Sequence, residues 1–172
     1  YLDYLYGKVN LKTLTPILKS IKGYARVTDA KVKFHGDLDA VETPLINLQY
    51  ENDGLLINLE KPTFKGINID GSFVNIQDMT SLKYGHVDVT LKATHMLDDN
   101  VLGILKAYKI NLPIKQLSGT TDANVHLYIP YDAPMKTFGV FKSKDSTFKI
   151  NDFEFYSKQG SVDLINSDVI IK

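Results

Sequence analysis

The sequence is dominated by segments in which apolar and polar side chains alternate. In residues 86–93 every second side chain is apolar, and residues 122–129 repeat the pattern. Because successive side chains of a strand point to opposite faces, such segments build an antiparallel sheet with one apolar and one polar face. What covers the apolar face is therefore the main question about function. The side chains on this face are Val87, Val89, Leu91, Ala93, Ala123, Val125, Leu127 and Ile129.

Turn residues separate the strand candidates. Asn52-Asp53-Gly54 predicts a tight hairpin. Further turns are predicted at Ser118-Gly119, Lys144-Asp145 and Gln159-Gly160, because these residue pairs are typical of turns and interrupt the alternation. We therefore expect a mainly β, antiparallel fold in a single domain over residues 1–172.

Two short helices are predicted to interrupt the sheet. In residues 15–22, Thr15 is a suitable N-cap, Pro16 suits the first turn, and Gly23 follows as a stop signal. In residues 97–108, Asp98 or Asp99 is expected to cap a longer helix. This second helix has one apolar stripe, spaced by three and four residues, that must pack on something. We expect the helix to lie across the sheet as a lid or an end cap, with its polar side outward. The stripe consists of Val101, Ile104, Leu105 and Tyr108.

Composition excludes several classes of function. The 172 residues carry 20 basic and 20 acidic side chains, so no net positive charge attracts nucleic acid or anionic membranes. The basic residues are all Lys except Arg26, so the sequence has few planar guanidinium groups that could bind phosphate or carboxylate through two hydrogen bonds. The absence of Cys excludes a disulfide framework and a thiol nucleophile. No apolar run is long enough to span a membrane. Because the chain starts and ends within strand-like segments, we expect it to be a fragment, with any targeting segment or membrane anchor elsewhere.

Motifs of catalysis are missing from the sequence. There is no nucleophile elbow, zinc-protease helix, phosphate-binding loop or dinucleotide-binding glycine pattern. His86 and His126 lie on the polar faces of two strands, where a zinc pair is geometrically possible, but solvated histidines are the favoured interpretation. His35 and His95 are expected in turns or caps. We therefore expect no enzymatic activity, no cofactor and no metal.

An acidic stretch at residues 37–42 raises the possibility of a calcium loop. It contains Asp37, Asp39 and Glu42, but the residues between them are apolar and no glycine follows in the calcium-loop register. An exposed strand edge is the favoured interpretation.

Several segments together resemble a known family. They are the run 117–121 (Leu-Ser-Gly-Thr-Thr), the strand 125–130 (Val-His-Leu-Tyr-Ile-Pro), residues 139–141 (Gly-Val-Phe), the closing run 162–166 (Val-Asp-Leu-Ile-Asn), and the strand-turn-strand segment 64–78. These segments are similar to the large AsmA-like envelope proteins, and among them to the DUF3971 and YhdP-type region. The resemblance covers roughly residues 24 to 171.

The resemblance implies a curved antiparallel sheet, half-pipe or open-barrel-like, in a Gram-negative envelope protein. It further implies a periplasmic location, an inner-membrane anchor outside this segment, and a concave apolar face that holds phospholipid acyl chains, with other envelope proteins as further partners. Two interpretations stay open. Either the segment is part of a lipid-conducting groove, or its core is sealed and it is a structural or partner-binding module.

Overall fold

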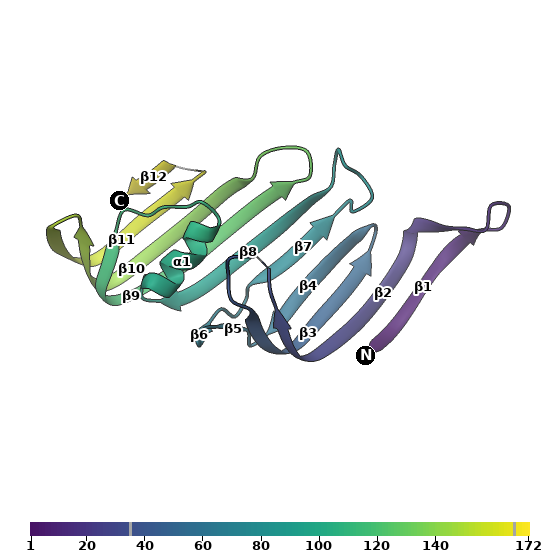
Figure 1. Cartoon of the computed structure of the whole chain (residues 1–172), viewed down its shortest axis with the longest axis horizontal. Coiled ribbons are helices and arrows are strands. Elements are labelled where there is room, and N and C mark those ends of the chain that lie inside the picture. Colours follow the sequence, from purple (N-terminus) through teal and green to yellow (C-terminus); the bar gives the residue numbers. More distant parts are fainter. Residues whose placement is uncertain (35, 167) are drawn as a thin grey trace.

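The computed structural model describes residues 1–34, 36–166 and 168–172 and shows a mainly β chain (Figure 1). Within these residues, α1 is the one α-helix. The elements are β1 (Leu2–Asn10), β2 (Thr15–Val32), β3 (Val41–Glu51), β4 (Gly54–Glu60), β5 (Thr63–Phe64), β6 (Ile67–Asn68), β7 (Phe73–Gln77), β8 (His86–His95), α1 (Asp99–Ala107), β9 (Lys115–Pro130), β10 (Lys136–Ile150), β11 (Phe153–Ile165) and β12 (Asp168–Ile171).

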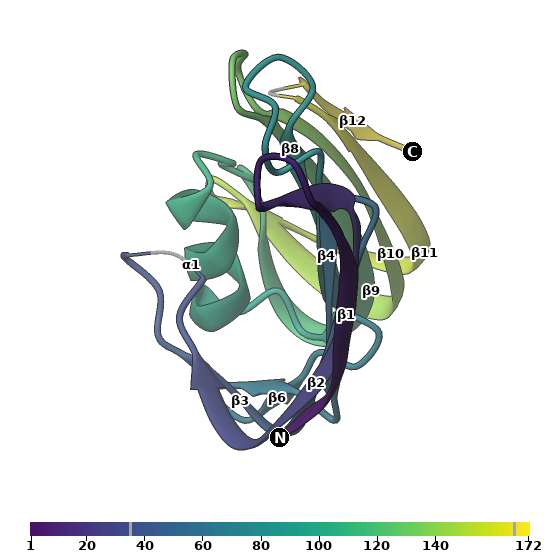
Figure 2. The ribbon, with the colours of Figure 1, turned by 90° about the vertical axis from the view of Figure 1, so that its right-hand side faces the viewer.

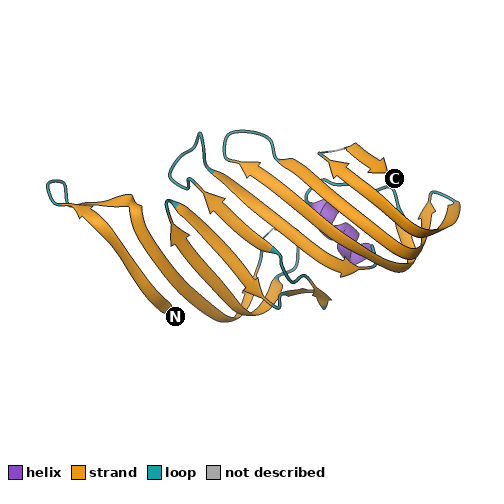
Figure 3. Ribbon diagram, turned by 180° about the vertical axis from the view of Figure 1, so that it is seen from behind, coloured by secondary structure: helices purple, strands orange, loops and turns teal. Residues whose placement is uncertain are grey.

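The strands form one open antiparallel sheet. Neighbours follow the order β1-β2-β3-β4-β7-β8-β9-β10-β11-β12, and the short strands β5 and β6 branch off from β3. The sheet curls so that α1 lies on its concave face (Figure 2). From behind, the convex face is seen without a covering helix in the described part of the chain (Figure 3). The predicted curved antiparallel sheet is therefore confirmed.

The predicted helix at residues 15–22 is wrong, because these residues form the start of β2. Pro16 and Ile17 pair with β1 in an antiparallel hairpin. A helix of about eight residues is marginal in water unless an apolar face packs on something, and the side chains of residues 11–19 are all exposed. Proline is tolerated here because β3 pairs with β2 only from Lys22 onward, which leaves one side of this segment unpaired by β3.

Three of the predicted turns are also wrong, since long strands run through them. Residues 118–119 lie inside β9, 144–145 inside β10 and 159–160 inside β11. The first two pairs instead accommodate a shift in register between β9 and β10, where Ser118 is opposite Thr147. Gly119 has a φ of +86°, a conformation that L side chains rarely adopt. Such bulges bend a strand and increase its twist, which favours a curled sheet.

The predicted hairpin at residues 52–54 is confirmed. Asn52 and Asp53 have φ values of +53° and +63°, and Glu51 pairs with Gly54 across the turn. Two successive positive φ values match the right-handed twist of the flanking strands.

The second predicted helix is confirmed as α1. Asp98 is its N-cap, and the carboxylate accepts hydrogen bonds from the backbone N–H groups of Asn100 at 2.9 Å and Val101 at 3.0 Å. The helix ends at Ala107, Tyr108 is its C-cap, and the next residue, Lys109, has a φ of +62°. The backbone N–H of Ile110 then reaches back to the carbonyl of Leu105 at 2.9 Å.

A matched pair of glycine substitutions tests the bulge. Gly119→Ala should lower the free energy of unfolding by about 1–3 kcal/mol, because the residue is held at positive φ, and its new Cβ would lie 2.6 Å from the carbonyl oxygen of Asp145. Gly103→Ala in α1 should instead raise it by about 0.5–1 kcal/mol, since nothing lies within 4 Å of that Cβ. Urea unfolding of both variants gives the two changes, and a neutral Gly119→Ala would contradict the assigned bulge geometry.

Candidate functional site

Apolar side chains form continuous rows across the concave face. Residues that are paired on neighbouring strands point to the same face, so the register traces each row. Two rows cross the middle strands: Ala25, Leu48, Ile57, Val74, Val89 and Leu127, and beside them Tyr50, Leu55, Ile76, Val87 and Ile129. Two more cross the C-terminal strands: Leu91, Val125, Gly139, Leu164 and Val169, and beside them Ala93, Ala123, Phe141, Val162 and Ile171. All eight wall residues predicted from the sequence therefore share this face.

The eight predicted wall residues differ in how far they are covered. Val89, Val125 and Leu127 are buried, with 8%, 3% and 0% of their surfaces exposed. The other five are half-buried: Val87, Leu91, Ala93, Ala123 and Ile129. The centre of the face is thus sealed, whereas the positions around it retain accessible apolar surface.

Two segments lie in front of the concave face, α1 and the described residues between β2 and β3, 33–34 and 36–40 (Figure 1). Between them and the sheet is an apolar pocket of about 90 Å³. Pockets that take a whole small molecule measure roughly 300–1,000 Å³, so this one has room for part of a chain-like ligand. Its lining includes Phe34 and Leu38 from the covering segment, Phe64 from β5, and Leu91, Ala93, Ala123 and Phe141 from the sheet.

The four predicted lid residues all line this pocket. Val101 and Leu105 are buried, with 7% and 3% exposed, and Ile104 and Tyr108 are half-buried. Burial raises the pKa of the Tyr108 hydroxyl. Asp99, Asn100 and Lys106 are exposed on the other side of α1. The helix therefore lies across the sheet with its apolar side inward and its polar side outward.

A buried amide fixes the start of this lid. Gln116 is 2% exposed, and its Oε1 accepts hydrogen bonds from the backbone N–H of Leu97 at 2.9 Å and from the hydroxyl of Thr121 at 2.8 Å. Its Nε2 donates to the Ser118 carbonyl at 3.1 Å and to Ser146 Oγ at 3.0 Å. One side chain thus ties Leu97, the residue before the N-cap of α1, to the bulge between β9 and β10.

The cap of the lid carries a perturbed carboxyl group. Partial burial raises the pKa of Asp98, but the backbone N–H of Val101, the nearby His95 and the backbone N–H of Asn100 outweigh it, so that the pKa is lower than its ordinary value. His95 Nε2 lies 3.3 Å from Asp98 Oδ2. His95 thus lies at the helix cap, where the sequence placed it, whereas His35 lies outside the described residues.

The two histidines of the possible zinc pair lie together on the convex face. Asp88 stands between them, with Oδ1 2.9 Å from His126 Nε2 and Oδ2 3.3 Å from His86 Nε2. Each histidine also contacts an aromatic ring, Tyr128 for His86 and Phe138 for His126. Over the described residues, no group of three or more His, Asp or Glu side chains is suited to hold a metal ion.

The acidic stretch at residues 37–42 pairs with lysines. Asp39 lies 2.9 Å from Lys65, and Glu42 lies 2.7 Å from Lys31 across the β2–β3 pair. These exposed ion pairs contribute little to stability.

Sequence reasoning missed part of the site. Phe34 continues the alternation of Ala30 and Val32, but both it and Leu38 line the pocket from an irregular segment after β2, which that alternation does not predict. Apolar and polar residues also alternate at 46–50 and 55–59, but only the register shows that the apolar ones continue the rows of β8 and β9.

Acid should loosen the cap of the lid. Because the pKa of Asp98 is lowered in the folded chain, its ionised carboxylate stabilises the folded state at neutral pH. This stabilisation is lost as the pH falls below 3.8, the ordinary pKa of the group, towards its pKa in the folded chain. Asp98→Asn keeps an oxygen that caps the helix but removes the titration, so this variant should lose less stability between neutral pH and about pH 3. Urea unfolding at the two pH values measures the difference, and identical losses in both proteins would contradict it.

Trimming the lid should uncover the pocket. Val101→Ala with Leu105→Ala removes two buried side chains and should lower the free energy of unfolding by about 3–5 kcal/mol, while binding of a hydrophobic dye rises. Lys106→Ala, on the exposed side of the same helix, should change neither quantity. A double variant with unaltered stability and dye binding would show that α1 does not cover the sheet in solution.

Comparisons with known proteins identify the family. The YhdP protein family matches residues 4–172, which is nearly the whole chain. Searches of curated proteins and of solved structures gave no match. The family match includes every strand from β2 to β12, the lid and all the predicted wall residues. The described part of the chain has no helix that is both long and apolar enough to cross a membrane. The chain belongs to the YhdP family, which is not a known enzyme family.

Proposed function

We propose that this chain is a segment of a periplasmic lipid-binding groove that contributes to phospholipid transport and outer-membrane homeostasis. The observation that carries the proposal is the set of apolar rows across the concave face, which include half-buried side chains. Acyl chains are the natural occupants of such a surface because they replace water there without needing hydrogen bonds. No catalytic step is part of this role.

The pocket under α1 supports the same proposal. It is lined almost throughout by apolar side chains, and it opens onto the half-buried positions of the same face. Its volume of about 90 Å³ suits the end of one acyl chain, while the rest of the chain would lie along the open rows. The YhdP family and the resemblance to AsmA-like proteins support an envelope location, with the anchor to the inner membrane outside this chain.

The alternative is a structural or partner-binding module, and the burial of the central row supports it. Leu127 is completely buried and Val89 nearly so. A carboxylate at Leu127 or Val89 would therefore unfold the chain whether the face is a lipid groove or a sealed core, so variants at these two positions do not distinguish the two functions. The half-buried positions do separate them.

Native mass spectrometry of gently purified protein tests the groove. We expect phospholipid to be retained by the unmodified chain. Ala123→Asp places a carboxylate on the apolar face at a half-buried position that lines the pocket. It should reduce the retained lipid about tenfold or more, because a polar group transferred among acyl chains without a partner costs about 1–3 kcal/mol.

The neighbouring residue supplies the control. Asn124→Asp adds the same carboxylate to the same strand, but on the exposed polar face opposite Lys92. This variant should retain as much lipid as the unmodified chain. Lipid-free unmodified protein, or a folded Ala123→Asp variant with unchanged lipid content, would favour the structural module.

A further inference from the structure

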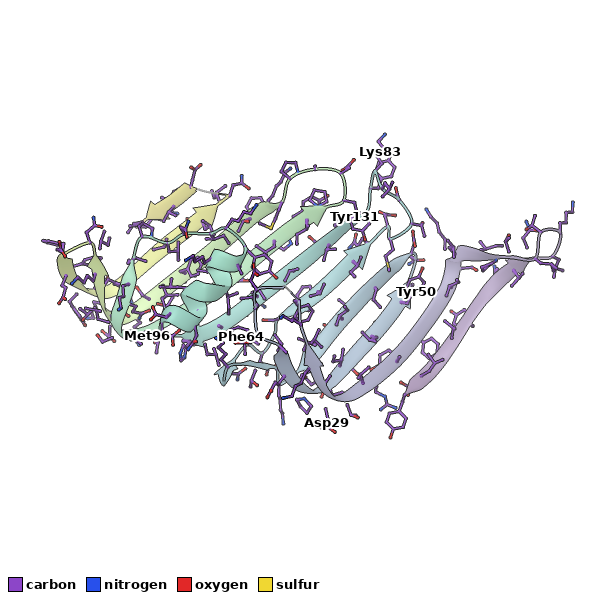
Figure 4. All side chains as sticks on the ribbon, viewed as in Figure 1. Asp29, Tyr50, Phe64, Lys83, Met96 and Tyr131 are labelled. Atoms are coloured by element: carbon purple, nitrogen blue, oxygen red, sulfur yellow. The ribbon has the colours of Figure 1, made fainter. Side chains whose placement is uncertain are left out.

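One rim of the sheet carries exposed apolar side chains on a pair of loops. Met79, Leu82 and Tyr84 belong to the loop between β7 and β8, and Tyr131 begins the loop between β9 and β10. Their exposed fractions are 40%, 81%, 63% and 41%. Lys83 and Tyr131 lie at the same end of the strands as Tyr50, away from Met96 and Phe64 (Figure 4). We call Met79, Leu82, Lys83, Tyr84 and Tyr131 the rim knob.

Backbone hydrogen bonds hold the two loops of the rim knob together. The N–H of Tyr131 donates to the carbonyl of Gly85 at 3.0 Å, and the N–H of Gly85 donates to the carbonyl of Ser81 at 2.7 Å. A Cβ at Gly85 would overlap both the Tyr131 ring and the Ser81 carbonyl. The absence of a side chain there lets the Tyr131 ring pack directly against the neighbouring loop.

The turn between β3 and β4 holds the same loop from its other side. Asp53 is 1% exposed, and its carboxylate accepts hydrogen bonds from both the backbone N–H and the hydroxyl of Thr80. Its carbonyl accepts from the N–H of Met79 at 3.0 Å. The exposed side chains of the rim knob therefore project from a fixed backbone, so their exposure is not a consequence of a loose loop.

The side chains of the rim knob suit a lipid–water interface. Leu82 is the most exposed of them, and Lys83 Nζ lies 5.2 Å from the ring centroid of Tyr84. Tyrosine and lysine each combine an apolar body with a polar end, and they are enriched where acyl chains meet headgroups. A protruding tip of a few side chains is also small beside the roughly 800 Å² that each partner buries in a standard protein interface.

The position of the rim knob connects it with the apolar face. Ile76, Val87 and Ile129 lie next to one another on that face, one residue inside the strand ends from which the two loops emerge. We propose that the rim knob inserts shallowly into the surface of a lipid bilayer, next to the open edge of the apolar face. Because the chain has equal numbers of acidic and basic residues, this binding depends on apolar contact with the bilayer and not on electrostatic attraction to anionic lipids.

A single tryptophan tests the insertion, since the chain contains none. In Leu82→Trp, emission should shift to the blue on addition of phosphatidylcholine vesicles, and lipids brominated on their acyl chains should quench it. Asn124→Trp, on the exposed polar face, should show neither change. Leu82→Asp with Tyr84→Asp should reduce co-sedimentation of the chain with the vesicles about tenfold, because burying one large apolar side chain contributes about 1.5–3 kcal/mol.

The outcomes separate the rim knob from the groove. Ala123→Asp should lose retained phospholipid but sediment with vesicles as the unmodified chain does, whereas the rim variant should show the opposite pattern. An unshifted Leu82→Trp spectrum would overturn the proposal. So would a spectrum that shifts with protein concentration in the absence of vesicles, since a second copy would then be the occupant of the rim knob.

Discussion

Antiparallel pairing in one continuous register is the interaction on which the rest of the structure depends. A shift of one residue between two strands would move an entire strand's apolar side chains to the convex face. The register instead keeps Ile57, Val74, Val89 and Leu127 in line across four strands. The apolar face, its pocket and the surface on which α1 packs all follow from that alignment.

The same alignment explains why a single helix is enough to shape the site. α1 buries Val101 and Leu105 against the sheet, and Phe34 and Leu38 cover the face beside it. Neither element extends over all four rows, so half-buried apolar side chains border the sealed centre. A face covered in part differs from a sandwich with a closed core, and it leaves the accessible apolar surface on which the proposed lipid binding rests.

Local patterns predicted the fold class well and the turns less well. The alternation in β8 and β9, the hairpin at Asn52 and the cap at Asp98 each depend on a few neighbouring residues, and all were predictable. The helix at residues 15–22 was wrong because pairing with β1 decides the conformation there, and cap and stop residues carry no information about pairing. Gly119 was assigned to a turn because a glycine required by a bulge looks the same in sequence. Phe34 continues a local alternation, but its place at the pocket, like that of Leu38, depends on packing with distant strands, which local alternation does not encode.

The amide of Gln116 has a mechanical consequence for the lid. It bonds the chain just before α1 to the same bulge that sets the register of β9 and β10, and all of these groups are buried. Releasing Leu97 from Gln116 would leave buried polar atoms without hydrogen-bond partners. The other end of the helix joins β9 through residues 108–114, which have no regular secondary structure. Ile110 and Ile114 in this stretch are nevertheless buried, so the lid is anchored to the sheet at both of its ends.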